Sequence, residues 1–258
     1  MHPLLFKIGP LEIRTWGLMV LIGFIVGIYY VARRARVYGV NPEKIWDFGF
    51  WVALSGIVGS RLFYVLYHIP YFREHPAEMI RFWEGGAVYF GGFVFALVVG
   101  IVYLVKNKRQ IPFWPVADFS SEALALGIFF GRWGCFFNGC CFGKESNLPW
   151  AVVFPPGSPA YDVMGSLRIH PSQLYESFAN LILFFVLLKL EQNKPFDGFI
   201  FLVYLIFASL IRFAVDFTRY YEPENVFILT LNQWISIAIM LGSAAVAVAL
   251  WRKKQKSL

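Results

Sequence analysis

The stretches SGIVGSRLFYVLY (residues 55–67), ALGIFFGRWGCFF (125–137) and YLIFASLIRFAVDF (204–217) each carry one arginine inside an apolar run. An arginine placed in hydrocarbon costs about 2.5 to 3.5 kcal/mol on insertion scales, so Arg61, Arg132 and Arg212 each need a compensating partner. The planar guanidinium group matches phosphate through paired hydrogen bonds. The three stretches therefore predict membrane helices and an anion site among them.

The composition favours a membrane protein, since 58% of the 258 residues are hydrophobic and only 15% are charged. Almost the whole chain is needed for apolar segments and short connections, so we expect a single integral membrane domain over residues 1–258. The expected fold is all-α, with seven transmembrane helices. Their expected ranges are 16–32, 46–69, 86–105, 116–138, 172–190, 198–217 and 230–251.

The fourth of these segments is the least apolar, because it contains Asp118, Glu122 and Arg132. Charged side chains inside a membrane helix normally face the interior of the bundle. We therefore expect this helix to turn its charges inward.

The basic residues predict the orientation, because Lys and Arg accumulate on the cytoplasmic side. Thirteen of the 23 lie in one set of connections and seven in the other, and the three embedded arginines complete the number. The amino terminus is therefore expected outside and the carboxyl terminus in the cytoplasm. The first apolar run is followed by Arg33, Arg34 and Arg36 without an obvious small-residue cleavage site, so we interpret it as a permanent span.

The net charge of +7 does not indicate a nucleic-acid partner, because the basic residues mostly flank the apolar segments. Anionic lipid headgroups fit this distribution better. We expect a membrane partner and no nucleic acid.

The predicted topology gives the three arginines a common depth, since segments two, four and six all run from inside to outside. At 1.5 Å per residue they lie roughly 7 to 12 Å below the outer surface. A shared anion site is one interpretation, and separate snorkelling to the outer headgroups is the alternative. Asp216, one turn beyond Arg212, is the expected internal counter-ion, and Arg219 lies another turn outward.

Two further motifs enter the same layer from the odd-numbered segments. Gly91 and Gly92 allow close approach either of a ligand or of a neighbouring helix. The string HPSQLYE at residues 170–176 contains His170 and Glu176, and it is also typical of a helix start.

The string GRWGCFFNGCCFG at residues 131–143 resembles the signature of the phosphatidylglycerol-prolipoprotein diacylglyceryl transferases. Other stretches agree in the same order along nearly the whole chain, and HPSQLYE is the most specific of them. These stretches are residues 16–19, 23–24, 59–61, 91–92, 149–151 and 170–176, together with Arg212, Asp216 and Arg219.

The resemblance implies a seven-span enzyme of the bacterial inner (cytoplasmic) membrane. Such enzymes transfer the diacylglyceryl group of phosphatidylglycerol to the lipobox cysteine of a preprolipoprotein and release glycerol phosphate. The signal peptide of the preprolipoprotein is therefore an expected partner. Arg132 and Arg212 correspond to the essential arginines of the family. The other expected substrate-binding residues are Arg61, Gly91, Gly92, Asn138, Gly143, His170, Glu176, Asp216 and Arg219. No metal or other cofactor is implied.

Four positions depart from the family pattern. Cys135 stands where asparagine is common, Cys140 where an acidic residue is common, and Trp16 where tyrosine is usual. Phe90 replaces a histidine proposed as the base for the incoming thiol. The candidate bases are then His170, Glu176 and Tyr89, each with a capping or packing alternative. A lipid transferase with another acceptor and a non-enzymatic transporter or receptor for an anionic lipid are the competing functions.

Cys135, Cys140 and Cys141 are all the cysteines of the chain. Packing as free thiols, a disulfide from Cys135, and a metal site completed by His170 or an acid are the alternatives. The sequence leaves all three open.

Overall fold

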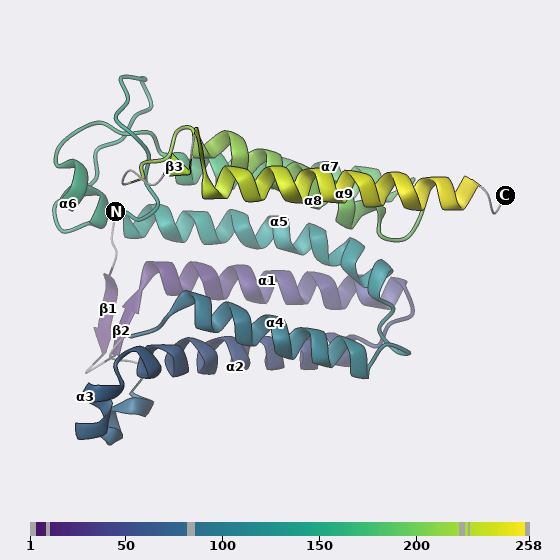
Figure 1. Cartoon of the computed structure of the whole chain (residues 1–258), viewed down its shortest axis with the longest axis horizontal. Coiled ribbons are helices and arrows are strands. Elements are labelled where there is room, and N and C mark those ends of the chain that lie inside the picture. The colour runs from purple at the N-terminus through teal and green to yellow at the C-terminus, as the bar shows by residue number, and fades with distance from the viewer. Residues whose placement is uncertain (1–3, 9–10, 82–85, 222–224, 227, 256–258) are drawn as a thin grey trace. The chain divides into compact units, whose positions relative to one another are not determined.

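The computed structural model describes residues 4–8, 11–81, 86–221, 225–226 and 228–255. Within this part of the chain the long elements are seven helices (Figure 1). They are α1 Thr15–Val37, α2 Pro42–Tyr67, α4 Tyr89–Lys106, α5 Phe113–Asn138, α7 Ser172–Glu191, α8 Phe199–Asp216 and α9 Leu231–Gln255. Each of the seven expected ranges overlaps one of these helices.

Five of the helices, α1, α2, α7, α8 and α9, are long and apolar enough to cross a membrane, and α4 is a shorter apolar helix. Helix α5 differs because it carries Asp118, Glu122 and Arg132. The side chains of Asp118 and Glu122 are both 0% exposed. This confirms the prediction that α5 turns its charges toward the protein interior.

Short elements complete the described structure. They are strands β1 Leu4–Ile8 and β2 Leu11–Arg14, strands β3 Asn225–Val226 and β4 Leu229–Thr230, helices α3 Ile69–Glu74 and α6 Pro159–Met164, and the 3₁₀ helix η1 Pro76–Ile80. The strands form two short two-stranded sheets, which the prediction did not include, in a chain that is otherwise mostly helical. Each pair lies directly before a long helix. The backbone there is not yet helical, and the paired strand supplies its hydrogen-bond partners.

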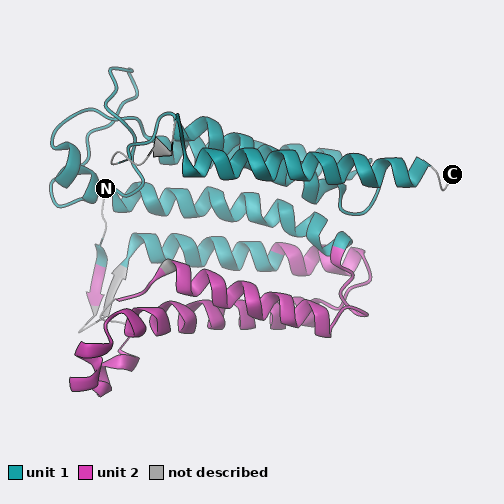
Figure 2. Ribbon diagram, viewed as in Figure 1, with its two compact units in different colours: residues 1–5, 14–29, 114–258 teal, residues 6–13, 30–113 magenta. Residues whose placement is uncertain are grey.

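The chain divides into two compact units (Figure 2). One consists of residues 1–5, 14–29 and 114–258, and the other of residues 6–13 and 30–113. We call them unit 1 and unit 2. The single domain expected over residues 1–258 stays a prediction.

In unit 2, helices α2 and α4 meet through glycines on both sides. A Cβ added to Gly59 would lie 2.5 Å from Cβ of Phe95 and 2.8 Å from the carbonyl oxygen of Gly91. A Cβ added to Gly91 would lie 2.5 Å from Cβ of Phe63 and 2.7 Å from the carbonyl oxygen of Gly59. Small residues allow such close backbone approach between membrane helices. Packing between α2 and α4 therefore accounts for Gly91, and Gly92 faces the carbonyl oxygen of Gly56 in the same way.

In unit 1, the first part of α1 packs on α5 through glycines as well. A Cβ on Gly23 would lie 3.1 Å from Cβ of Phe130, and one on Gly134 would lie 3.1 Å from Cβ of Met19. Elsewhere in the unit, Ala125 of α5 joins an apolar core with residues of α7 and α8, namely Leu183, Leu187, Ile200 and Tyr204. Helix α5 therefore contacts α1, α7 and α8 within unit 1.

Asp118 of α5 fixes the start of α8. Its carboxylate accepts hydrogen bonds from the backbone N–H groups of Gly198 at 2.9 Å and Phe201 at 3.0 Å, and it pairs with Nζ of Lys194 at 3.0 Å. A carboxylate at a helix amino terminus satisfies unpaired N–H groups and complements the helix dipole. The contact fixes where α8 begins, and thereby the position of Arg212 along that helix.

The glycine crossing predicts that Gly91→Ala destabilises the protein by about 1 to 3 kcal/mol, because the added methyl group overpacks the α2–α4 contact. Gly100→Ala on the same helix is the matched control, since its Cβ would meet atoms no closer than 3.6 Å. Thermal unfolding in detergent measures both variants. Equal stability of the two would contradict the packing role.

Candidate functional site

Glu176 lies between two of the predicted arginines. Its Oε1 atom is 2.8 Å from Nη2 of Arg132 on α5, and its Oε2 atom is 3.4 Å from Nη1 of Arg212 on α8. The carboxyl group is buried, whereas both guanidinium groups keep 22% of their side-chain surface exposed. Arg132 and Arg212 thus meet as predicted, and Glu176 of α7 is the group that joins them, while the predicted presence of Arg61 at the same site stays a prediction.

Asp216 forms the second ion pair of Arg212. Its Oδ1 atom lies 3.1 Å from Nη2 of Arg212, one helical turn earlier, which confirms the expected counter-ion. The carboxylate also accepts hydrogen bonds from the hydroxyl groups of Tyr221 and Thr230. Polar groups from α7, α8, the connection after α8 and the strand before α9 thus hold Arg212 in one position.

Tyr221 links Arg212 to Arg219. Its hydroxyl oxygen accepts a hydrogen bond of 2.7 Å from Nη2 of Arg212, and the guanidinium carbon of Arg219 lies 5.4 Å from the centre of its ring. Burial raises the pKa of Tyr221, and its hydrogen bond to Asp216 raises the pKa further, while the two arginines lower it. Tyr221 therefore remains a neutral hydrogen-bonding group at physiological pH.

Arg219 is the least compensated of the three arginines at this site. Its side chain is only 9% exposed, and its Nε atom has no hydrogen-bond partner among the described residues. Three guanidinium groups here accompany two carboxylates, those of Glu176 and Asp216. With all five groups ionised, one positive charge is left over, which suits a monoanionic ligand.

The HPSQLYE motif builds the start of α7, as its packing interpretation expected. Helix α7 begins at Ser172, whose hydroxyl group donates a hydrogen bond of 3.1 Å to the carbonyl oxygen of Thr218. Nδ1 of His170 lies 3.2 Å from the hydroxyl group of Tyr175, which in turn accepts a hydrogen bond from Trp150. A role of His170 in binding substrate stays a prediction.

Gly143 lies where no larger residue fits. A Cβ there would approach Cβ and the carbonyl oxygen of His170 to 2.5 Å, and Oγ of Ser172 to 2.6 Å. Its N–H group donates to the carbonyl oxygen of His170 at 3.1 Å, and it forms an isolated bridge with Arg219. Loop shape thus accounts for Gly143, while a headgroup contact of Gly143 or of the half-buried Asn138 stays a prediction.

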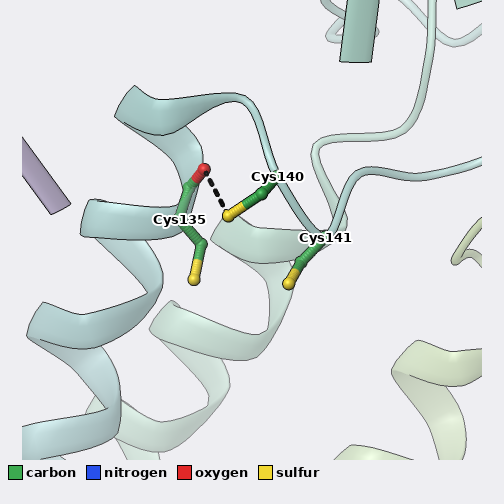
Figure 3. A group of neighbouring side chains, drawn as sticks. All are labelled: Cys135, Cys140 and Cys141. Atoms are coloured by element: carbon green, nitrogen blue, oxygen red, sulfur yellow. Dashed lines mark hydrogen bonds between the residues drawn. The ribbon is translucent and has the colours of Figure 1, made fainter. Parts of the chain in front are cut away.

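The three cysteines gather around the carboxyl end of α5 (Figure 3). Gly139, with φ of 75°, ends the helix in the left-handed conformation. Its N–H group bonds the carbonyl oxygen of Phe136 at 3.2 Å, and that of Cys140 bonds the carbonyl oxygen of Cys135 at 3.1 Å. This pair of bonds is a Schellman motif, which turns the chain back over the last helical turn. All three thiols are free, so the disulfide interpretation does not describe this structure.

The remaining predicted site residues belong to unit 2. The guanidinium group of Arg61 donates to backbone oxygens, those of Met79 at 2.9 Å, Gly86 at 3.0 Å and Glu78 at 2.6 Å. These bonds tie the connection between α2 and α4, so they give Arg61 a structural partner. A contact of Arg61, Gly91 or Gly92 with substrate stays a prediction. The side chain of Tyr89, a candidate base, lies outside the described residues.

Sequence reasoning missed two polar residues of this site, Tyr221 and Thr230. The spacing of Thr230 and Gln233 matches a capping box, and their reciprocal hydrogen bonds of 3.0 and 3.2 Å confirm that it precedes α9. No comparable pattern marks Tyr221, whose contacts depend on how the chain returns after α8.

Comparison with known proteins shows the family of this chain. A family model described as prolipoprotein diacylglyceryl transferase matches residues 3–249. A phosphatidylglycerol–prolipoprotein diacylglyceryl transferase of Geobacter sulfurreducens is 34% identical over 98% of this chain and 96% of its own length. Proteins of the same description from Bordetella parapertussis and a Nostoc species are 36% and 33% identical, over 94% and 98% of this chain and 92% and 90% of their own lengths. Because the family model and these relatives span nearly the whole chain, the protein belongs to the prolipoprotein diacylglyceryl transferase family.

Proposed function

We propose that this protein transfers the diacylglyceryl group of phosphatidylglycerol to the lipobox cysteine of preprolipoproteins, forming a thioether and releasing glycerol phosphate. Membership of the family supports the reaction class. The observation that carries the proposal is the positive charge left over among Arg132, Arg212 and Arg219. Phosphatidylglycerol presents a phosphodiester with a single negative charge, which matches it.

The arginines stabilise the transition state more strongly than they stabilise the bound lipid. As the cysteine sulfur bonds to the glycerol carbon, the carbon–oxygen bond breaks and its electron pair leaves with the phosphate. The phosphate group thereby changes from a singly charged diester to a monoester that carries more negative charge. Guanidinium groups already held in place by Glu176 and Asp216 meet this charge without reorganising. In this proposal Arg132 and Arg212 are the catalytic residues, and Glu176 and Asp216 position them.

We further propose that all seven long helices span the bacterial inner membrane as one domain, with the amino terminus outside. The excess of thirteen basic residues over seven in the two sets of connections supports this orientation. Substrate recognition then occurs in the outer half of the membrane, where exported signal peptides arrive.

Replacing Arg132 by alanine is expected to lower the transfer rate by at least about a hundredfold, the usual loss when one preorganised donor to a developing anion is removed. The assay uses purified protein, vesicles containing phosphatidylglycerol and a lipobox peptide, with thioether formation read by mass spectrometry. Arg73→Ala, on the exposed side of α3, is the control arginine. Binding of the lipid without transfer by the wild-type protein would instead support a transporter or receptor.

Tyr221→Phe is expected to lower the transfer rate about ten- to a hundredfold, because a hydrogen bond to a charged group contributes about 1.5 to 3 kcal/mol. The matched control is Tyr220→Phe, whose neighbouring ring stacks on Phe142 with centroids 5.7 Å apart. Steady-state kinetics of both variants in the same vesicles measure the difference. A similar rate for the two variants would remove Tyr221 from the site.

The proposed orientation predicts the behaviour of carboxyl-terminal fusions in bacterial cells. A green fluorescent protein fused after residue 258 is expected to fluoresce, and alkaline phosphatase fused there is expected to be inactive, because the junction lies in the cytoplasm. The opposite pattern would reverse the topology and place the arginine layer in the inner half of the membrane.

A further inference from the structure

The three cysteines form a preassembled cluster of sulfur ligands. Their sulfur atoms all lie within 4.8 Å of one another. Zn–S bonds of about 2.3 Å at tetrahedral angles place sulfur atoms about 3.8 Å apart, so a small contraction brings these sulfur atoms to the spacing of a zinc site.

The backbone is shaped to hold these sulfurs together. The Schellman turn at Gly139 brings Cys140 back beside Cys135, and Sγ of Cys140 lies 3.7 Å from the carbonyl oxygen of Cys135. Cys141 then adopts φ of 60°, the only positive φ of a non-glycine residue in the described chain. Such a conformation is unfavourable for a residue with a side chain and is typically maintained at functional sites.

A neighbouring helix supports the cluster from behind. Gln173, near the start of α7, is 1% exposed, and its Nε2 atom donates a hydrogen bond of 2.8 Å to the carbonyl oxygen of Cys140. Buried hydrogen bonds behind a ligand fix its orientation, as the outer layer of metal sites commonly does. Helix α7 thus supports the backbone of the cluster at Cys140.

The number of ligands indicates the kind of metal site. Within the described residues, the group contains three thiols and no fourth histidine, cysteine or carboxylate. Structural zinc sites have four protein ligands, whereas catalytic zinc sites have three and leave one position for substrate or water.

We propose that Cys135, Cys140 and Cys141 bind one Zn²⁺ and that its fourth position takes the sulfur of the acceptor cysteine. The role of the fourth position rests on the proposed function. Arg132 precedes Cys135 by one turn of α5, so the metal would hold the acceptor sulfur beside the arginines that receive the phosphate.

Transfer of the diacylglyceryl group to the acceptor sulfur needs no oxidant. The acceptor thiol loses its proton to solvent on binding Zn²⁺, because a coordinated thiol is deprotonated. Its sulfur lone pair forms the bond to the glycerol carbon, and the carbon–oxygen bond pair leaves with glycerol phosphate. The product thioether carries no charge, so it binds zinc more weakly than the thiolate, and water takes its place.

Metal content of the purified full-length protein tests the binding site without any activity measurement. We expect one zinc per chain, and a thiolate-to-cobalt charge-transfer band when Co²⁺ replaces Zn²⁺. Each single change, Cys135→Ser, Cys140→Ser or Cys141→Ser, is expected to weaken metal binding by at least about a hundredfold, more than the loss of an outer-layer partner. Tyr220→Phe, beside the cluster, is expected to bind metal as the wild type does.

Metal-free wild-type protein, prepared with a chelator, provides a test that needs no variant. Three reactive thiols that bind no metal would overturn the proposal, and so would the loss of two thiols to a disulfide. The same holds if the metal-free protein transfers the diacylglyceryl group at the full rate.

The acceptor role is tested in the absence of phosphatidylglycerol. A lipobox peptide with cysteine is expected to change the absorption of the cobalt-loaded protein, and the same peptide with serine is expected to leave it unchanged. An unchanged spectrum with both peptides would overturn the acceptor role. A metal site that binds the cysteine peptide in a protein without any transfer activity would contradict the proposed function and leave the inferred site standing.

Discussion

The carboxylate of Glu176 is the contact on which the site depends. It is buried, and it pairs with Arg132 of α5 and Arg212 of α8, so one side chain compensates two arginines that would otherwise be costly among apolar helices. Removing a single member of such a network leaves the others uncompensated. The ion pairs therefore join three helices and fix the arginines in position before any ligand arrives.

The carboxyl end of α5 and the turn after it place the neighbouring segments of the site. The Schellman turn at Gly139 ends α5 one turn after Cys135. It directs the chain toward α7 and the connection after α8. Gly143 then fits against His170 and Ser172 at distances that exclude any side chain. The signature segment thus has one continuous structural role, which is to place charged and sulfur-bearing groups of unit 1 close together.

Residues of one type serve different purposes in the two units. Arg132 and Arg212 pair with carboxylates, whereas Arg61 bonds three backbone carbonyl groups of its own connection. An arginine in an apolar run requires a partner, but the sequence does not specify whether that partner is an anion or a carbonyl group. The paired glycines of α4 are similar, since close approach serves a ligand or a helix equally, and here α2 provides the neighbour.

The sequence by itself determined the positions of the seven long helices, the inward-facing charges of α5 and the pairing of Arg212 with Asp216, because these depend on apolar run length and on spacing along one helix. The short strands, the contacts of Tyr221 and the clustering of the three thiols were decided only by the tertiary structure. Arg132 and Glu176 are 44 residues apart, and their contact exists because α5 and α7 pack side by side. Local patterns state which groups need partners, and only the packing of helices selects them.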